Sequence, residues 1–311
     1  MTDEKKRSLS RRTFVAGTAA AGVLASPALN AFSAKAAGDA PDLAVASGTD
    51  AVKNTKAVIE AMGGIGKFVK PGQTVGLLPN AQGKHKGCST HPDIVKTIVD
   101  LCKEAGAKEV LWYTWLNEKV QKNRGMQADV DKSGAKLVYC PSDNESLWKN
   151  FKIPRGVALK ECRVFKPLWD CDVFINIPIV KDHKGSYFTG SLKNYMGASH
   201  PKENRTFHPT FEGDDVVHME QCIADLNTIV RKSDLIIMDA MEILITNGPF
   251  GPGKVSTPQK VIAGVDRVAI DAYGATLLGL KGPEITMIKK SYEHGLGEID
   301  LAKIKVKEIT T

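Results

Sequence analysis

The residues best suited to chemistry lie between Asn176 and Asn194, directly after an apolar segment at 173–177. Histidine exchanges protons near neutral pH, and lysine attracts anions as a point charge. We therefore predict one polar ligand site here, with His183 and Lys193 as its catalytic residues. The predicted ligand-binding residues of this cluster are Lys181, Thr189, Gly190, Ser191 and Asn194.

The cluster contains a helix start that suits an anion. The segment from Thr189 to Ser191 leads into a short helical stretch that has Lys193 in its first turn. Free amides at a helix start bind phosphate or carboxylate groups. We expect Lys193 and the amides of Gly190 and Ser191 to bind the anionic group of a small ligand. The Walker consensus is absent, so a nucleoside triphosphate is not implied. The alternative is that Lys181 and Lys184 are solvated loop charges and that Thr189 is an ordinary cap.

Histidine is also a common ligand of transition metals. His183, His200 and His208 fall within 26 residues, and His91 lies at another helix start. No pair has the fixed helical spacing of metal ligands, so a bound metal stays an alternative and the cofactor is unknown. His200 and His208 lie in a segment rich in proline, lysine and asparagine, where we expect them at the surface.

The acidic side of the site is predicted from the C-terminal third of the chain. Glu242 follows a predicted strand, and Asp271 has apolar neighbours on a predicted helix at 267–278. A buried carboxylate needs a cation, a metal or backbone donors. We therefore predict that Asp271 is buried and paired, and that Glu242 and Asp271 are the supporting carboxylates of the catalytic site. Asp266 is expected to cap the helix.

The loop at 247–253 reads Asn-Gly-Pro-Phe-Gly-Pro-Gly. Its composition is typical of tight turns. It is either a simple turn or a segment whose backbone lies close to the ligand.

The elements that position these residues alternate between short apolar runs and helical patterns. This order is typical of an α/β fold with a mostly parallel, doubly wound sheet and helices on both faces. In such sheets ligands bind beyond the carboxyl ends of the strands, where the polar cluster lies. We expect strands at 43–46, 75–78, 109–114, 137–140, 173–177, 235–239 and 261–265. We expect helices at 51–62, 90–105 with Thr90 as N-cap, 118–132, 215–230 and 267–278.

The region 142–167 is less regular, and it is predicted to be a peripheral hairpin or an inserted segment in the middle of the fold. There is no internal repeat and no low-complexity linker. We therefore assign residues 37–311 to a single α/β domain.

The first 36 residues have the order of a secretory signal: a charged segment, an apolar stretch and Ala34-Lys35-Ala36. Arg11 and Arg12 are followed by an aromatic residue, which favours the twin-arginine route. The apolar stretch has 16 residues and includes Pro27, whereas a spanning helix needs roughly 20 apolar residues. We expect a signal peptide at 1–36, export by the twin-arginine translocase, a periplasmic location and no permanent membrane anchor.

Charge argues against nucleic acid as a partner. The formal net charge of the chain is +7, and the leader holds six basic and two acidic residues, which leaves the rest near +3. Phosphate-backbone binding needs clustered lysine and arginine, and no such cluster is evident.

The six cysteines show no C-x-x-C spacing, so a standard zinc site or a ferredoxin-type cluster is not supported. An oxidising compartment permits disulfides, and Cys162 and Cys171 are the nearest pair, but spacing does not settle connectivity. Some of the six are expected to be plain buried thiols.

The polar cluster also resembles a known family. The residues Ile175-Asn176-Ile177-Pro178, Lys181, His183, Thr189-Gly190, Lys193-Asn194 and Gly197 are similar to the central signature of the bacterial and archaeal domain of unknown function 362 family. Similar to its flanking motifs are Leu78-Pro79-Asn80, Thr90-His91-Pro92, Asn247-Gly248-Pro249 and Asp266 through Asp271.

The resemblance implies an α/β fold and a shared ligand site that includes Asn80, while the family's activity is largely undefined. Some members carry an added ferredoxin-type segment, and this chain lacks its cysteines. Leu78 stands where the family often has lysine. A more distant similarity is to nickel-pincer lactate racemases, which use a histidine and a lysine ten positions apart, as His183 and Lys193 are here.

Two functions are consistent with these features. The first is an exported, redox- or metal-linked enzyme that acts on an anionic small molecule. The alternative is a non-catalytic periplasmic binding protein for an anionic solute or a metal. Stoichiometric metal or a chromophore would favour the enzyme, and reversible binding without turnover would favour the binding protein.

Overall fold

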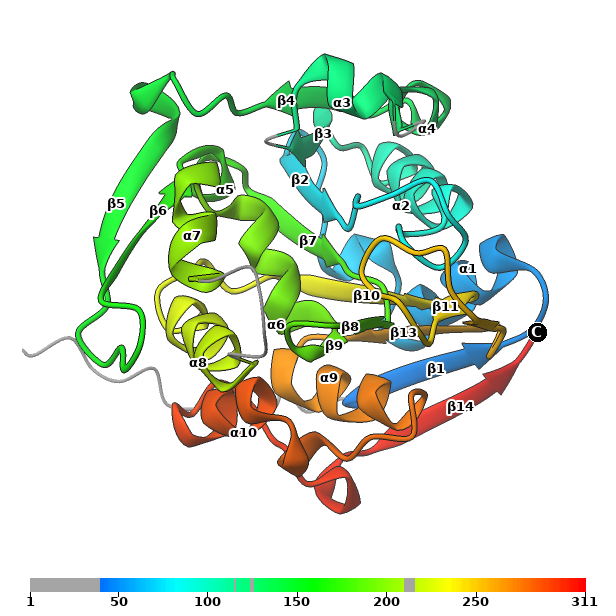
Figure 1. Ribbon diagram of the computed structural model, residues 1–311. Coiled ribbons are helices and arrows are strands. Elements are labelled where there is room, and N and C mark those ends of the chain that lie inside the picture. Colours follow the sequence, from blue (N-terminus) through cyan, green and yellow to red (C-terminus); the bar gives the residue numbers. More distant parts are fainter. Residues whose placement is uncertain (1–39, 115, 124–125, 210–215) are drawn as a thin grey trace, which may run out of the picture. The chain divides into compact units, whose positions relative to one another are not determined.

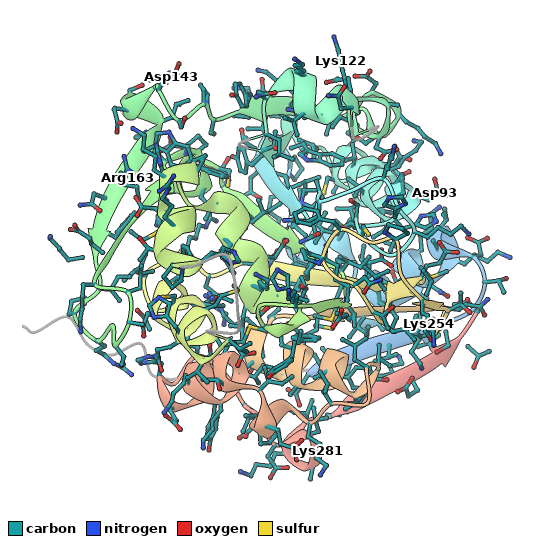
Figure 2. The ribbon with its side chains drawn as sticks, viewed as in Figure 1. Asp93, Lys122, Asp143, Arg163, Lys254 and Lys281 are labelled. Atoms are coloured by element: carbon teal, nitrogen blue, oxygen red, sulfur yellow. The ribbon has the colours of Figure 1, made fainter. Side chains whose placement is uncertain are left out.

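The computed structural model describes residues 40–114, 116–123, 126–209 and 216–311. The predicted signal peptide at 1–36 lies outside the described residues. Residues Ala40–Thr311 form one compact unit. Charged side chains such as Lys254 and Lys281 are exposed at the periphery of this unit (Figure 2).

An eight-stranded sheet is the centre of the described part, in the order β14-β1-β13-β10-β7-β2-β3-β4 (Figure 1). Its strands are β1 (Leu43–Ser47), β2 (Thr74–Pro79), β3 (Glu109–Thr114), β4 (Lys136–Tyr139), β7 (Val173–Ile177), β10 (Leu235–Ala240), β13 (Lys260–Gly264) and β14 (Val306–Thr310). Only β13 runs antiparallel to its neighbours among these strands, and all other pairs are parallel. The prediction of a mostly parallel sheet is confirmed.

The direction of β13 follows from its connection. Parallel neighbours need a long crossover, usually a helix. The chain between β10 and β13 instead forms a small hairpin of β11 (Ile243–Leu244) and β12 (Val255–Ser256), so it turns back beside β10.

Helices cover both faces of the sheet, as predicted. On one face lie α1 (Ala51–Ala61), α2 (Pro92–Glu104) and α4 (Met126–Ser133), and on the other lie α6 (Ser191–Asn194), α8 (Val216–Asn227), α9 (Arg267–Thr276) and α10 (Thr286–Glu293). Alternate residues of a strand point to opposite faces. In β1, Ala44 therefore packs with the first set of helices and Leu43 with the second.

Local boundaries differ from the prediction at two places. The N-cap of α2 is His91, whose Nδ1 accepts from the amide of Asp93 at 3.2 Å. Thr90 has another role, because its hydroxyl donates to the carbonyl of Ile177 at 2.7 Å and so joins two strand ends. The helix predicted at 118–132 is two helices, α3 (Glu118–Asn123) and α4.

The irregular middle of the chain contains a hairpin, which was one of the two predicted alternatives. Its strands are β5 (Trp148–Lys152) and β6 (Glu161–Phe165), and the short helix α5 (Pro167–Asp170) follows. Trp148, Val164 and Phe165 are buried in a core cluster shared with Phe174 of β7. The hairpin is thus packed against the domain.

All six cysteines lie in the described part, where they are buried and form no disulfide with one another. None of the helices described there combines the length and the apolar character that crossing a bilayer requires.

The sheet reverses its strand order between β2 and β7. From β2 the chain proceeds through α2 to β3 and β4, whereas from β7 it proceeds to β10 on the other side. Such a switch point opens a crevice at the carboxyl ends of the two strands. The segments that follow β2 and β7 therefore lie at the place where a ligand is expected.

Candidate functional site

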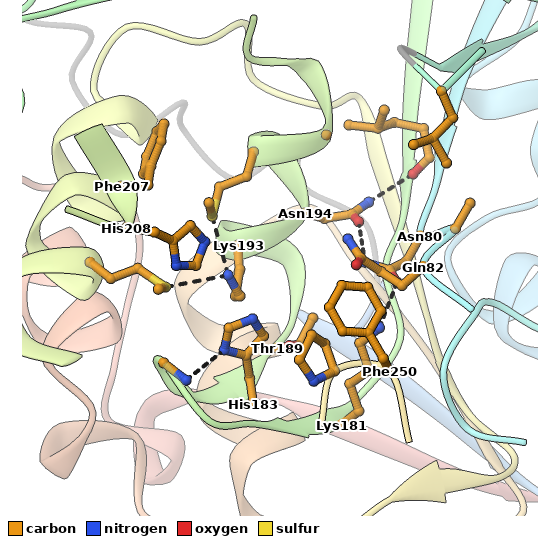
Figure 3. A pocket seen from close by; sticks show the side chains of 18 of the residues that line it. Asn80, Gln82, Lys181, His183, Thr189, Lys193, Asn194, Phe207, His208 and Phe250 are labelled. Carbon is orange, nitrogen blue, oxygen red and sulfur yellow. Dashed lines mark hydrogen bonds between the residues drawn. The ribbon is translucent and has the colours of Figure 1, made fainter. Parts of the chain in front are cut away.

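A cavity of about 350 Å³ lies beyond the carboxyl ends of β2 and β7 (Figure 3). Its lining comes from the end of β2 and the segment after it, from the end of β3 with Leu116, and from the segment after β7. It is completed by residues 207–209, by Met219 of α8 and by residues 249–250. The predicted site residues that line it are Asn80, Lys181, His183, Thr189, Lys193 and Asn194.

A chain of asparagine amides forms one side of the cavity. Asn80 Nδ2 donates to Asn194 Oδ1 at 2.9 Å, and Asn194 Nδ2 donates to Asn176 Oδ1 at 2.7 Å. Asn194 Nδ2 also donates to the carbonyl of Leu78 at 2.8 Å, and Asn176 Nδ2 donates to the carbonyl of Ser191 at 3.1 Å. Because satisfied buried networks are rigid, α6 is held firmly against the ends of β2 and β7.

Lys181 is fully buried in the short strand β8 (Lys181–His183). Its Nζ donates to Asn80 Oδ1 at 3.0 Å and to the carbonyl of Cys88. A buried ammonium needs such acceptors. Lys181 therefore places a fixed positive charge at the asparagine side of the cavity.

Lys193 of α6 has a different environment. Its side chain is 8% exposed, and Nζ lies 3.2 Å from Met196 Sδ and 3.6 Å from Met219 Sδ. Thioether sulfur is a weak acceptor. Burial lowers the pKa of Lys193 to about 7, although the nearby Glu220 carboxylate acts in the opposite direction. Both the amine and the ammonium are therefore populated near neutral pH.

His183 is buried at the end of β8, and its Nδ1 accepts from the amide of Gly185 at 3.0 Å. This bond places the proton of the neutral ring on Nε2. Burial, followed by the charges of Lys193 and Lys181, holds the pKa of His183 well below its usual value. His183 is therefore neutral near pH 7.

The expectation that His200 and His208 are surface residues is wrong for His200 and holds only in part for His208, which is half-buried. His208 lines the cavity, its ring lies 6.3 Å from that of His183, and burial lowers its pKa to about 4. His200 is 1% exposed, packs against Trp148 and bonds through Nε2 to the carbonyl of Ser142 at 3.0 Å. The polar residues next to these histidines in the sequence did not indicate these contacts.

Thr189 ends β9 (Tyr187–Thr189) and is 2% exposed. It lines the cavity, and its Oγ1 has no hydrogen-bond partner among the described residues. Buried hydroxyl groups nearly always have a partner. Thr189 therefore offers an unused donor and acceptor to a ligand.

Asp271 is fully buried, which confirms the prediction from its apolar neighbours. Its carboxylate accepts from the amide of Ser191 at 2.6 Å and from the amide of Leu192 at 2.9 Å. Burial raises the pKa of Asp271 to about 7. The start of α6 is thus already capped by a side chain of α9, so the expected use of the Ser191 amide for a ligand is wrong.

Gly190 and Ser191 accordingly lie behind the cavity lining rather than in it. A Cβ on Gly190 would lie 2.5 Å from Asp271 Oδ1. Glycine at this position permits the close approach of α9 to α6.

Glu242 does not line the cavity, contrary to its predicted place in the site. Its Oε1 pairs with Lys86 Nζ at 3.0 Å, and the lysine side chain is exposed while that of Glu242 is partly exposed. The chain leaves the sheet after β10 and turns into β11, which carries Glu242 away from the crevice.

The loop at 247–253 approaches the cavity, where Pro249 and Phe250 form part of the lining. The amide of Gly248 donates to Asp182 Oδ2 at 2.8 Å, and its carbonyl accepts from the amide of Lys184 at 3.2 Å. These bonds hold the loop against β8, so it closes one side of the site.

The lining is cationic and apolar. It includes three lysines and two histidines, and no aspartate or glutamate among the residues that the structure describes. Its apolar wall consists of Leu78, Leu116, Met196, Phe207, Met219 and Phe250 with several smaller residues. Such a cavity suits an anion with an apolar body.

Across the described ranges, no group of three or more histidine, cysteine, aspartate or glutamate side chains is placed to hold a metal ion. The described residues of the site supply cations, amides and imidazoles instead. These groups bind anions and exchange protons.

Comparison with known proteins gives one curated relative, a thylakoid-associated protein of Synechocystis sp.. It is 28% identical over 201 residues, which are 63% of this chain and 60% of the relative. The chain thus matches less than two thirds of the relative's length.

Among solved structures, the lactate racemase apoprotein from Thermoanaerobacterium thermosaccharolyticum has a TM-score of 0.46 at 13% identity, covering 73% of this chain and 57% of that one. A Thermotoga maritima protein from a structural genomics consortium has a TM-score of 0.38 at 15% identity, covering 60% of this chain and 49% of that one.

The matched region of the family comparison spans residues 75–276, and so includes the ends of β2 and β7, the asparagine chain, both buried lysines and Asp271. This is more than half of the chain. The protein therefore belongs to the family described as domain of unknown function DUF362.

Proposed function

We propose that this protein is an exported enzyme that binds a small anionic molecule in the cavity and moves a proton on it. The observation that carries the proposal is the charge of the lining, which has three lysines and no described carboxylate. A cavity that is lined by positive charges attracts and orients an anion.

Three side chains have distinct roles in this proposal. Lys181, fixed by Asn80 and Cys88, provides a permanent charge for the anionic group. His183 donates through Nε2 to an oxygen of the ligand, because its Nδ1 is occupied by Gly185. Lys193 exchanges the proton, since a group whose pKa lies near the working pH is effective in both directions.

The place of action is proposed from the leader. The paired arginines, the weakly apolar stretch and the small residues before Ala37 support export by the twin-arginine translocase to the periplasm.

Binding and turnover are tested separately. Thermal melts of the full chain with acetate, pyruvate, phosphate and sulfate measure binding. NMR spectra of the same carboxylates in D₂O measure exchange of C–H protons. We expect at least one anion to raise the melting temperature of wild type, and a C–H signal to disappear only with active protein.

Lys181→Met should weaken the stabilisation by anions, because Lys181 holds the anionic group, whereas Lys193→Met should abolish the exchange of C–H protons. Lys254→Met is the matched control, because Lys254 is exposed and outside the cavity lining. If no anion stabilises wild type more than Lys181→Met, the proposed function is wrong. Stabilisation without any exchange would support the non-catalytic binding protein instead.

A further inference from the structure

The two buried lysines of the cavity form separate positive positions. Lys181 comes from β8 and is bound by Asn80 and Cys88, whereas Lys193 comes from α6 and contacts two methionines. In Figure 3 the Asn80 side of the cavity and the Lys193 side lie apart. A single small anionic group would therefore bind to one of the two lysines and not to both.

The Lys193 side also contains unused hydrogen-bonding capacity. Thr189 Oγ1 is buried without a partner among the described residues, and the acceptors that Lys193 Nζ contacts there are thioether sulfurs. His183 has its Nδ1 occupied, so its Nε2 proton is the one available on this side. A hydroxyl, an amine and an imidazole N–H together match an oxyanion.

We propose that the ligand is a dianion, with one acidic group at Lys181 and Asn80 and the second at Lys193, Thr189 and His183. This inference rests on the proposed function and names its substrate class. The apolar wall formed by Leu78, Leu116, Phe207 and Phe250 contacts the body between the two acidic groups.

When the second acidic group binds, Lys193 takes up a proton. The groups that act on Lys193 are Glu220 from α8, His183 from β8 and His208 from the segment before α8. The two histidines are neutral near pH 7, and burial raises the pKa of Glu220 to about 7. An anion beside Lys193 favours its ammonium, so the fraction of Lys193 that was neutral gains a proton, and Lys193 is then the proton donor of the proposed exchange.

The test compares dianions with monoanions of the same skeleton. Isothermal titration calorimetry of the full chain at pH 7 would use isophthalate against benzoate and glutarate against pentanoate. Each titration is repeated in buffers that differ in ionisation enthalpy, because the dependence of the heat on the buffer gives the protons taken up. The variants are Lys193→Met, Thr189→Val and Lys181→Met, with Lys254→Met as control.

We expect a dianion to bind wild type at least about tenfold more tightly than its matched monoanion, with net proton uptake. Lys193→Met should abolish both the preference and the uptake, Thr189→Val should reduce the preference, and Lys254→Met should change neither. Lys181→Met should weaken dianions and monoanions alike.

The inference is overturned if each monoanion binds as tightly as its dianion. It is also overturned if Lys193→Met leaves the proton uptake unchanged. In both cases anions still bind, so the proposed function survives. Absence of binding by every anion, here and in the melts, would remove the proposed function as well.

Discussion

Lys193 is a residue whose charge is costly to bury in the folded protein. Its ammonium is buried against two thioethers, whereas Lys181, equally buried, has two carbonyl oxygens as acceptors. Burial without good acceptors disfavours the charged form. The difference between the two lysines explains why we assign the fixed charge to Lys181 and the exchangeable proton to Lys193.

Lys193→Met should therefore stabilise the protein at pH 6, by about 2–4 kcal/mol. The pKa falls from 10.5 in the unfolded chain to about 7 in the fold. Below pH 7 both states hold the proton, so the whole cost of burying the charge is present. Between pH 7 and 10.5 only the unfolded state holds it, so wild-type stability rises with pH.

The measurement is urea unfolding of wild type and Lys193→Met at pH 6, 8 and 10. The stability gain of the variant should shrink as pH rises through this range. A variant that is less stable than wild type at pH 6 would show that Lys193 has a structural partner.

Asp271, in contrast to Lys193, stabilises the fold, because its carboxylate joins α9 to α6. It accepts from the amides of Ser191 and Leu192, so Asp271→Ala leaves two buried donors without an acceptor. We expect a loss of about 2–5 kcal/mol in the free energy of unfolding. The control Asp93→Ala removes a partly exposed ion pair with Lys132 and should cost about 1 kcal/mol or less. Equal unfolding midpoints for the two variants would contradict this role.

At the scale of elements, the site depends on segments that meet at one edge of the sheet. Thr90 joins the chain before α2 to the end of β7, and the asparagine chain joins α6 to β2. The loop at 247–253 closes the site from the other direction through its bonds with β8. The cavity is therefore a product of these connections rather than of any one element.

Gly248→Ala tests the loop. A Cβ at Gly248 would lie 1.7 Å from the carbonyl oxygen of Asp182, so the loop and β8 must move apart. We expect a loss of about 1–3 kcal/mol in stability and weaker binding of anions, because Pro249 and Phe250 leave the lining.

Thermal melts with and without a bound anion measure both effects. The matched control is Gly66→Ala, where a Cβ would meet no atom within 4 Å. Wild-type anion binding in Gly248→Ala would show that the loop is not part of the site.

At the scale of the whole molecule, the buried thiols fit the proposed export route. All six cysteines are buried in the described unit and form no disulfide there, and burial raises the pKa of the thiols of Cys102, Cys140 and Cys162 to about 12. Thiolates are the reactive form. Because the twin-arginine route carries folded proteins, these thiols would be protected before they meet an oxidising compartment.

Export is predicted to depend on the arginine pair. Replacing Arg11 and Arg12 with lysine should leave the precursor in the cytoplasm, since this pathway recognises the pair itself and not only its charge. Cell fractionation with detection of the chain measures the result. Arg7→Lys, outside the pair, is the control and should be exported normally. Unchanged periplasmic yield in a strain without the twin-arginine translocase would remove this prediction.

Local sequence patterns were sufficient for seven of the eight strands of the central sheet, for helices α1, α2, α8 and α9, and for the position of the polar cluster, but they gave neither β14 nor α10. The period of apolar residues depends only on nearby positions, and so does a cap such as Asp266, whose carboxylate accepts from Val268 and Ala269 as predicted. The polar cluster after 173–177 follows the same logic, because a buried strand that ends in polar residues marks the edge where ligands bind.

Contacts between distant segments were decided only by the tertiary structure. No local sequence pattern indicates that β14 pairs in parallel with β1 or that His208 lies beside His183. The same is true of the turn after β10, which carries Glu242 away from the cavity. The same holds for Asp271, whose burial was predictable from its neighbours but whose partners were not. Burial follows from the types of adjacent residues, whereas the identity of a partner depends on which segments the folded chain brings together.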